Sequence, residues 1–240
     1  VLAMAVSAAN VGISLLSPAI PQLRDDLMVT SDEAQLVLSA FLIMLGFGQL
    51  IAGSLSDRIG RRPVLVYGSL LFVLSGFGAL LANSIEMLVF MRILQGLGAA
   101  ACMAMGRVII SDSFQHAEAG RQMSTITMFQ SVVPLLGFSF GGVLADLVGW
   151  RGSVGLMVVT AAIVFAGASM LLAESRDPSI KPVPATRIIF VYLQLLVTPL
   201  FIANAMMAAT VTAVYFSMGG FLPYEFKRLG SSAFEYGLYF

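Results

Sequence analysis

The chain has 240 residues, of which 58% are hydrophobic and 11% are charged, and its mean hydropathy is +0.93. A soluble domain of this length cannot bury so much apolar surface, so the composition excludes a soluble globular fold and indicates a membrane protein. Thirteen basic and thirteen acidic residues balance to zero, so the charge gives no reason to expect a nucleic-acid partner. The single cysteine, Cys102, excludes an internal disulfide and a thiolate metal cage.

Seven apolar runs are each long enough to cross the hydrocarbon layer, for which about 20 helical residues suffice. We expect all of them to be helices, because a strand exposed to lipid leaves backbone groups unpaired. In chain order they cover residues 2–20, 36–55, 64–82, 87–110, 123–145, 154–173 and 199–220.

The first run carries Ser7, Asn10, Ser14 and Ser17 at intervals of three, four and three residues. This spacing places them along one face of a helix. We expect Asn10 and Ser14 to line a substrate path, with hydrogen bonding between helices as the alternative use of small polar residues.

The second run closes with a motif of Gly, Leu, Asp, Gly and Arg that returns with the same spacing at the end of the fifth run. Three hydrophobic runs lie between one copy and the next, and an odd number of crossings reverses the direction of the chain. We therefore expect the copies on opposite faces of the membrane, as in secondary transporters built from inverted three-helix repeats. The copies are Gly53, Leu55, Asp57, Gly60 and Arg62, and then Gly142, Leu144, Asp146, Gly149 and Arg151.

Loop charges predict the orientation. Arg58, Arg61 and Arg62 follow the second run, further cations follow the fourth and sixth runs, and the alternate loops hold fewer. By the positive-inside rule, the connections after even-numbered runs and the N-terminus are cytoplasmic.

Charged residues and prolines gather after the sixth run and predict a linker on the cytoplasmic side. We therefore expect three parts: a six-helix half over residues 1–173, the linker over 174–197, and the start of a second half over 198–240. A further apolar helix begins just before Phe240, so we expect the chain to be a fragment of a longer protein.

The fourth run contains Arg92 and Gln95, one to two turns from its outer end. An arginine inside a span costs about 2.5–3.5 kcal/mol on insertion scales, so it is usually retained to face a cavity or a partner. The alternative is a side chain that reaches water at the outer interface near Glu86. We take Arg92 as the main functional candidate, with Gln95 beside it.

The fifth run holds Pro134, Gly137, Gly141 and Gly142. Two glycines four positions apart let helices approach closely, and proline removes one backbone hydrogen bond. We predict a helix-packing motif here, with or without a role in coupling.

These motifs together resemble the major facilitator superfamily. The motif that closes the second run matches the family's signature between its second and third spans, and the Arg92 segment matches its fourth-span motif. The glycines of the fifth run resemble the antiporter motif of the drug-efflux branch. The segments Pro18-Ala-Ile-Pro21 and Gly149-Trp150-Arg151 look like the Bcr/CflA drug exporters.

The resemblance implies the N-terminal half of a major facilitator fold and the start of its second half. It implies a transporter that exports drugs or other small amphipathic compounds in exchange for protons. It also implies that Asp57, Arg58, Arg61 and Arg62 hold a cytoplasmic gate and that Arg92 serves proton or substrate coupling. A multi-pass protein of the bacterial inner membrane is expected, without cofactor or metal.

Two positions depart from the drug-exporter pattern, because Phe138 stands where the antiporter motif has proline and Ser14 where an acid is common. All thirteen acidic residues lie near span ends or in loops. A proton-carrying carboxylate is therefore expected either near a span end, such as Asp112, or in the remainder of the second half. The same fold with a sugar, an amino acid or another metabolite as cargo is the alternative. An enzyme is not expected, since the one histidine, His116, lies in a loop and no span carries paired carboxylates.

Overall fold

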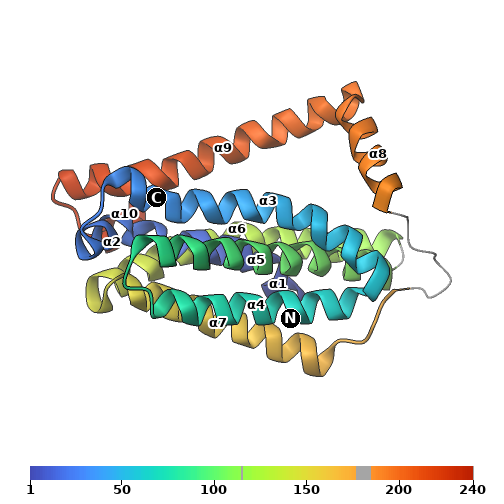
Figure 1. Ribbon diagram of the computed structural model, residues 1–240, viewed down its shortest axis with the longest axis horizontal. Helices are drawn as coiled ribbons and strands as arrows, with labels where there is room; N and C mark the ends of the chain where they lie inside the picture. The colour runs from blue at the N-terminus through green and yellow to red at the C-terminus, as the bar shows by residue number, and fades with distance from the viewer. Residues whose placement is uncertain (115, 177–184, 240) are drawn as a thin grey trace.

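The computed structural model describes residues 1–114, 116–176 and 185–239. Within these ranges seven helical spans are long and apolar enough to cross a membrane, and Figure 1 shows them lying side by side. The predicted all-α membrane fold is confirmed. In chain order the helices are α1 (Leu2–Ser14), the 3-10 turn η1 (Ser17–Ala19), α2 (Ile20–Leu27), α3 (Ser31–Ile59), α4 (Arg61–Leu80), α5 (Ile85–Ser113), α6 (His116–Val148), α7 (Trp150–Leu171), α8 (Ala185–Leu196), α9 (Pro199–Arg228) and α10 (Ala233–Tyr239).

The first span is one apolar run in the sequence and three pieces in the structure. After α1 ends at Ser14, the short turn η1 separates it from α2. Pro18 and Pro21 explain the interruption, because a proline has no N–H for the helix ladder and its ring crowds the preceding turn. The helix expected over 2–20 is therefore broken, and the span continues to Leu27.

Capping residues extend α3 and α5 beyond the apolar windows. The Thr30 side chain accepts a hydrogen bond from the N–H of Glu33, and the Glu33 carboxylate accepts one from the N–H of Thr30, which is a capping box. Ser84 caps α5 by accepting from the N–H of Met87. Both helices thus begin in the short polar connections.

The two copies of the glycine motif end their helices at opposite ends of the bundle (Figure 1), which confirms the inverted repeat. Gly60 follows α3 with φ of 104°, and Gly149 follows α6 with φ of 79°. Residues with a side chain rarely adopt these angles, so both turns require glycine. The two ends of the bundle are called the Arg61 end and the Asp146 end below.

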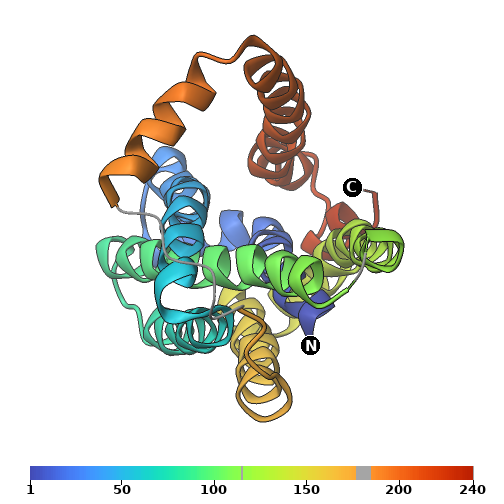
Figure 2. The ribbon, with the colours of Figure 1, turned by 90° about the vertical axis from the view of Figure 1, so that its right-hand side faces the viewer.

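Helix α9 contacts η1, α2 and α10 near the Asp146 end and diverges from the six-helix bundle toward the Arg61 end (Figures 1 and 2). Residues 199–214 of α9 are exposed, and burial begins at Phe216. Helix α10 packs on α6. The start of the second half therefore meets the six-helix half mainly at the Asp146 end.

The predicted linker over 174–197 falls partly on residues 177–184, which lie outside the described residues. Its described part contains α8. The division at residues 173 and 198 stays a prediction.

Candidate functional site

Arg92 on α5 has no exposed surface. Its Nε donates to the Val37 carbonyl oxygen at 3.2 Å, Nη1 to Gln95 Oε1 at 2.9 Å and Nη2 to the Gly12 carbonyl oxygen at 2.7 Å. The Phe41 ring centre lies 4.2 Å from its guanidinium carbon. Arg92 therefore joins α5 to α1 and α3, and it does not reach the outer interface.

All of these partners are neutral. Among the described residues no carboxylate lies within ion-pair distance of Arg92, and its remaining contact is the Met157 sulfur on α7 at 3.8 Å. A buried cation needs hydrogen bonds to offset its desolvation, and the two backbone carbonyls and the amide supply them here. Gln95 keeps its buried Nε2 without a hydrogen-bond partner. This geometry suits a residue that positions four helices.

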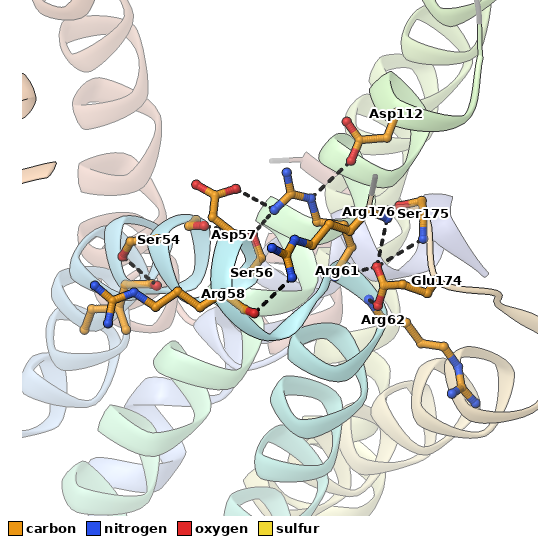
Figure 3. A network of polar contacts seen from close by, with 12 residues as sticks. Ser54, Ser56, Asp57, Arg58, Arg61, Arg62, Asp112, Glu174, Ser175 and Arg176 are labelled. Atoms are coloured by element: carbon orange, nitrogen blue, oxygen red, sulfur yellow. Dashed lines mark hydrogen bonds and ion pairs between the residues drawn. The ribbon is translucent and has the colours of Figure 1, made fainter. Parts of the chain in front are cut away.

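A charged cluster lies at the Arg61 end, where α3, α4 and α5 meet (Figure 3). Arg61 Nη1 donates to Asp57 Oδ1 at 2.6 Å, and its Nε donates to Asp112 Oδ2 at 3.1 Å. Arg61 thus bridges a carboxylate on α3 and one on α5. Arg58 is exposed, and its carbonyl oxygen accepts a hydrogen bond from Arg176 at 3.0 Å.

Glu174, three residues after α7, caps the first turn of α4 (Figure 3). Its carboxylate accepts hydrogen bonds from the N–H groups of Arg61 at 2.8 Å and Arg62 at 3.2 Å, and from those of Ser175 and Arg176. Partial burial opposes ionisation, but these four donors outweigh it and lower the pKa of Glu174 below its ordinary value. The positive end of the α4 dipole favours the same charge.

The last arginine of each glycine motif makes the same contact in both repeats. Arg62 of α4 donates from Nη2 to the Ser169 carbonyl oxygen near the end of α7, at 2.7 Å. Arg151 of α7 donates from Nη2 to the Ala82 carbonyl oxygen just after α4, at 3.0 Å. The last carbonyls of a helix lack partners within it and carry partial negative charge, so each arginine stabilises the end of the other's helix.

Asp146 is the counterpart of Asp57 in the repeat, and it joins the two halves. Its Oδ1 accepts a hydrogen bond from the N–H of Ala233 at 3.3 Å, and its Oδ2 accepts one from that of Phe234 at 3.0 Å. These are the first two residues of α10, so the carboxylate caps that helix at its positive end. A Cβ at Gly142 would lie 2.2 Å from the Ala233 carbonyl oxygen, so the close approach requires glycine.

Further charges lie at the Asp146 end around α2. Asp26 Oδ2 accepts a hydrogen bond from Arg151 Nη1 at 2.8 Å, which ties α2 to α7. Asp25 pairs with Lys227 at the end of α9. These side chains are 39–52% exposed, so each pair is worth less than about 1 kcal/mol.

The fifth-span glycines pack against the first span. A Cβ at Gly137 would lie 2.0 Å from Ser14 Oγ, and one at Gly141 would lie 2.4 Å from a backbone oxygen just after α1. Phe138 is buried, and its ring meets that of Tyr236 on α10 edge to face, with the centroids 6.0 Å apart. This helix therefore contacts both halves.

Asn10 donates a hydrogen bond to the carbonyl oxygen of α6 that Pro134 leaves without its helical partner. A proline at position 134 cannot donate to the carbonyl oxygen of Gln130, one turn earlier. Asn10 Nδ2 donates to that oxygen instead, at 3.1 Å, and Ser14 Oγ donates to the Asn10 carbonyl oxygen at 2.7 Å. Asn10 thus makes a hydrogen bond between helices, whereas Ser14 bonds to a carbonyl oxygen of its own helix.

The sequence profile of the Major Facilitator Superfamily matches residues 2–240. The chain belongs to the Major Facilitator Superfamily. A chloramphenicol resistance protein of Pseudomonas aeruginosa is 34% identical over 172 residues, which make up 70% of this chain and 38% of that protein. Multidrug resistance protein D of Escherichia coli K12 is 30% identical over 187 residues, or 78% of this chain and 46% of that protein.

This major facilitator chain thus spans less than half the length of these relatives. The multidrug transporter MdfA of Yersinia pestis is 36% identical over 138 residues, which cover 58% of the chain. The expected resemblance to the family's drug exporters is confirmed. The crystal structure of a bacterial homolog of the lysosomal transporter Spinster aligns with a TM-score of 0.76 at 17% identity. It covers 99% of this chain and 56% of that one, and it confirms the major facilitator fold.

Sequence reasoning singled out Asp57, Arg61 and Arg92 but overlooked two of the groups that bind helix ends. Glu174 appeared to be an ordinary linker charge, because nothing local reveals that the start of α4 lies against it. Asp146 carried a usable signal, since it occupies the position of Asp57 in the second copy of the motif.

Proposed function

We propose that this major facilitator chain is part of a carrier that exports drugs or other small amphipathic compounds by alternating access. The observation that carries the proposal is the difference between the two ends of the bundle. Helices α9 and α10 are bonded to the six-helix half at the Asp146 end, whereas α9 diverges from the bundle toward the Arg61 end (Figure 1). A carrier that opens one side at a time needs such one-sided contacts. The names of the relatives support drugs as cargo.

The proposal places the N-terminus and the Arg61 end in the cytoplasm, with the protein in a bacterial inner membrane. The positive-inside rule supports this orientation, because Arg58, Arg61 and Arg62 gather at that end. A membrane-impermeant thiol reagent should then label Leu147→Cys, at the Asp146 end, in intact cells and leave Ile59→Cys unlabelled. The opposite labelling pattern would refute this orientation.

The gate at the Arg61 end is assigned to Asp57, Arg58, Arg61 and Arg62. Asp146 caps a helix of the second half, so Asp57, its counterpart in the repeat, is suited to the same task when the Arg61 end closes. In the present structure Asp57 is paired with Arg61 instead. In this proposal the Asp57 carboxylate leaves Arg61 and caps a helix of the second half when the Arg61 end closes.

The proposed coupling ion is H+, with Asp112 as its acceptor. Asp112 is 31% exposed and shares Arg61 with Asp57. Protonation of Asp112 removes one of the two negative charges that hold Arg61, which links the proton to the gate. Asp112→Asn should keep transport down a substrate gradient and lose its dependence on the proton gradient.

A carrier of sugars, amino acids or other metabolites with the same fold is the second candidate. Phe138 in the fifth span and the position of the acidic residues, all near span ends or in loops, favour it. A panel of labelled drugs and metabolites, offered to the same vesicles, separates the two.

The decisive experiment measures uptake of labelled antibiotics into inverted membrane vesicles that contain the full-length protein. A proton gradient should drive uptake, and Arg92→Ala should abolish it because two buried carbonyls and Gln95 lose their donor. Arg92→Lys should restore part of the maximal rate with little change in KM, as expected for a positioning residue. Ser54→Ala, a surface substitution on α3, is the control.

Two results would count against these assignments. Normal uptake by Arg92→Ala would remove the role of Arg92. Failure of the wild-type protein to show gradient-driven uptake of any drug in the panel would refute the proposed export function.

A further inference from the structure

A small cavity of about 100 Å³ lies inside the six-helix half, between α1, α4, α6 and α7. Its aromatic members are Phe72 on α4 and Phe129 on α6, and its polar members are Ser7 on α1 and Thr160 on α7. No described residue of α9 or α10 lines it, and α7 lies on the side of the bundle opposite α9 (Figures 1 and 2). The cavity is therefore separate from the space between the two halves.

Ser7 belongs to the polar face of the first span, and its hydroxyl is buried without a partner. The residue is 2% exposed, and its Oγ makes no hydrogen bond to any described residue. Asn10 and Ser17 of the same face, in contrast, donate to backbone oxygens of α6 and α9. Buried polar groups are normally paired, so an unpaired one needs an explanation. A ligand in the cavity would supply the missing partner.

Thr160 complements Ser7 on the opposite helix. Its hydroxyl donates to the carbonyl oxygen of Leu156 in its own helix at 2.6 Å, so its oxygen keeps lone pairs that can accept a hydrogen bond. The Ser7 hydroxyl can donate. Together the two residues offer a donor and an acceptor to one hydroxyl group. None of the lining residues is charged, so an anion would lose its water here without gaining a counter-charge.

The apolar part of the lining suits an aromatic ring. Apolar cavities of about 150 Å³ bind benzene, and this one is smaller but bordered by the flexible side chain of Met4. The rings of Phe72 and Phe129 favour edge-to-face or offset contacts with another ring. A saturated acyl chain would gain apolar contact, but it would make no ring contacts and leave Ser7 unpaired.

The cavity is reached from the apolar surface of the bundle. Met4 and Phe129 line it and are both exposed, and Met128 and Val132 beside Phe129 on α6 are exposed as well. These residues belong to spans, so this surface faces lipid. An uncharged phenol dissolves in the hydrocarbon layer and can enter from there.

We propose that this cavity is a binding site for one small uncharged phenol, which enters from the lipid. The ring packs between Phe72 and Phe129, and the phenolic hydroxyl accepts a hydrogen bond from Ser7 and donates one to Thr160. The site belongs to the six-helix half alone and is distinct from the path that a transported compound takes between the halves.

The test measures binding of 4-fluorophenol by fluorine NMR to the full-length protein in lipid nanodiscs. Empty nanodiscs of the same lipid correct for partition, and all concentrations are those in the membrane. The bound signal should saturate at one molecule per protein, and phenol should displace it. Toluene, which has a methyl group in place of the hydroxyl, should displace it about three- to tenfold less effectively. Decane, which represents an acyl chain, should not displace it at the concentrations at which phenol does.

Two variants locate the binding site. Ser7→Ala should weaken binding of 4-fluorophenol about three- to tenfold and remove most of the preference for phenol over toluene. Ala161→Leu, a buried position in the lining, should abolish binding because the added side chain fills the cavity. Ser75→Ala is the matched control, since it removes a buried hydroxyl of α4 that does not line the cavity.

A variant with a gained property guards against loss of folding. Val164→Ala enlarges the cavity and should strengthen binding of 4-propylphenol relative to 4-fluorophenol. A thermal melt within a few degrees of the wild type confirms that each variant folds.

Three results would overturn the proposal. One is the absence of a saturable signal above that of empty nanodiscs, which would mean that lipid or water occupies the cavity. Another is displacement by toluene or decane that equals displacement by phenol. The third is wild-type affinity in Ser7→Ala or Ala161→Leu. None of these measurements involves transport, so a failure of the proposed export function leaves this proposal standing.

Discussion

Removal of the Asp146 carboxylate should favour the state in which the Asp146 end is open. In Asp146→Ala the N–H groups of Ala233 and Phe234, at the start of α10, lose their acceptor. Loss of a helix-capping side chain costs about 0.5–2 kcal/mol, and the exposure of Asp146 keeps the value near the middle of that range. A difference of about 1 kcal/mol changes the ratio of two states roughly fivefold.

Distances across that end provide the assay. Leu147 at the end of α6 and Leu229 after α9 are each 77% exposed, so cysteines there accept spin labels. Cys102 is buried and is replaced by alanine. In the full-length protein, Asp146→Ala should raise the population with the longer distance about fivefold relative to the shorter. Glu86→Ala, which removes an exposed carboxylate from the start of α5 at the same end, is the matched control.

A distance distribution in Asp146→Ala that matches the wild type would refute the role of this cap in holding the halves together. A shift toward the shorter distance would mean that the cap favours the open state, which is the opposite of the expected effect. An equal shift in Glu86→Ala would indicate a general effect of surface charge.

Three more changes test particular contacts. Gly60→Ala should lower stability by about 1–3 kcal/mol in thermal melts, because φ is 104° and the new Cβ would lie 2.3 Å from Glu174 Oε2. Gly53→Ala, with open space around it inside α3, should instead be neutral to slightly stabilising. Asn10→Ala should lower the free energy of unfolding by about 1–3 kcal/mol in the wild-type background. In the Pro134→Ala background the loss should be much smaller, because an alanine N–H at position 134 can donate to the same carbonyl oxygen of Gln130. Equal losses in both backgrounds would exclude this role of Asn10. Because its pKa is lowered, Glu174 stabilises the start of α4 above the ordinary carboxyl pKa, and this stabilisation disappears as the pH falls through the lowered value. Amide protection there should decrease on acidification in the wild type and be low at every pH in Glu174→Gln.

The spans and the inverted repeat were predictable because their causes are local. Hydrocarbon thickness requires about 20 apolar helical residues, and the runs of this chain satisfy that requirement directly. The turns after α3 and α6 need positive φ, so both copies of the motif keep glycine at 60 and 149. The capping box at Thr30 and the break at Pro18 also have local causes, but the apolar runs alone did not predict them.

The partners of the polar groups depended on the packing of distant helices. Arg92 was recognisable as unusual from its position alone, yet its acceptors at Gly12 and Val37 lie on helices that no spacing rule connects to it. Asn10 and Pro134 each looked like an isolated feature until the contact between α1 and α6 joined them.

Hydropathy and periodicity thus predicted the seven spans and that the halves of the repeat are inverted. Tertiary structure decided which helix ends Glu174 and Asp146 would cap and which carbonyl oxygens would accept hydrogen bonds from Arg92. The physical reason is that, in lipid, the backbone N–H and C=O groups must be paired within the segment itself, so helix formation depends on local sequence. The hydrogen bonds of a buried side chain are completed only by whichever helix packs beside it.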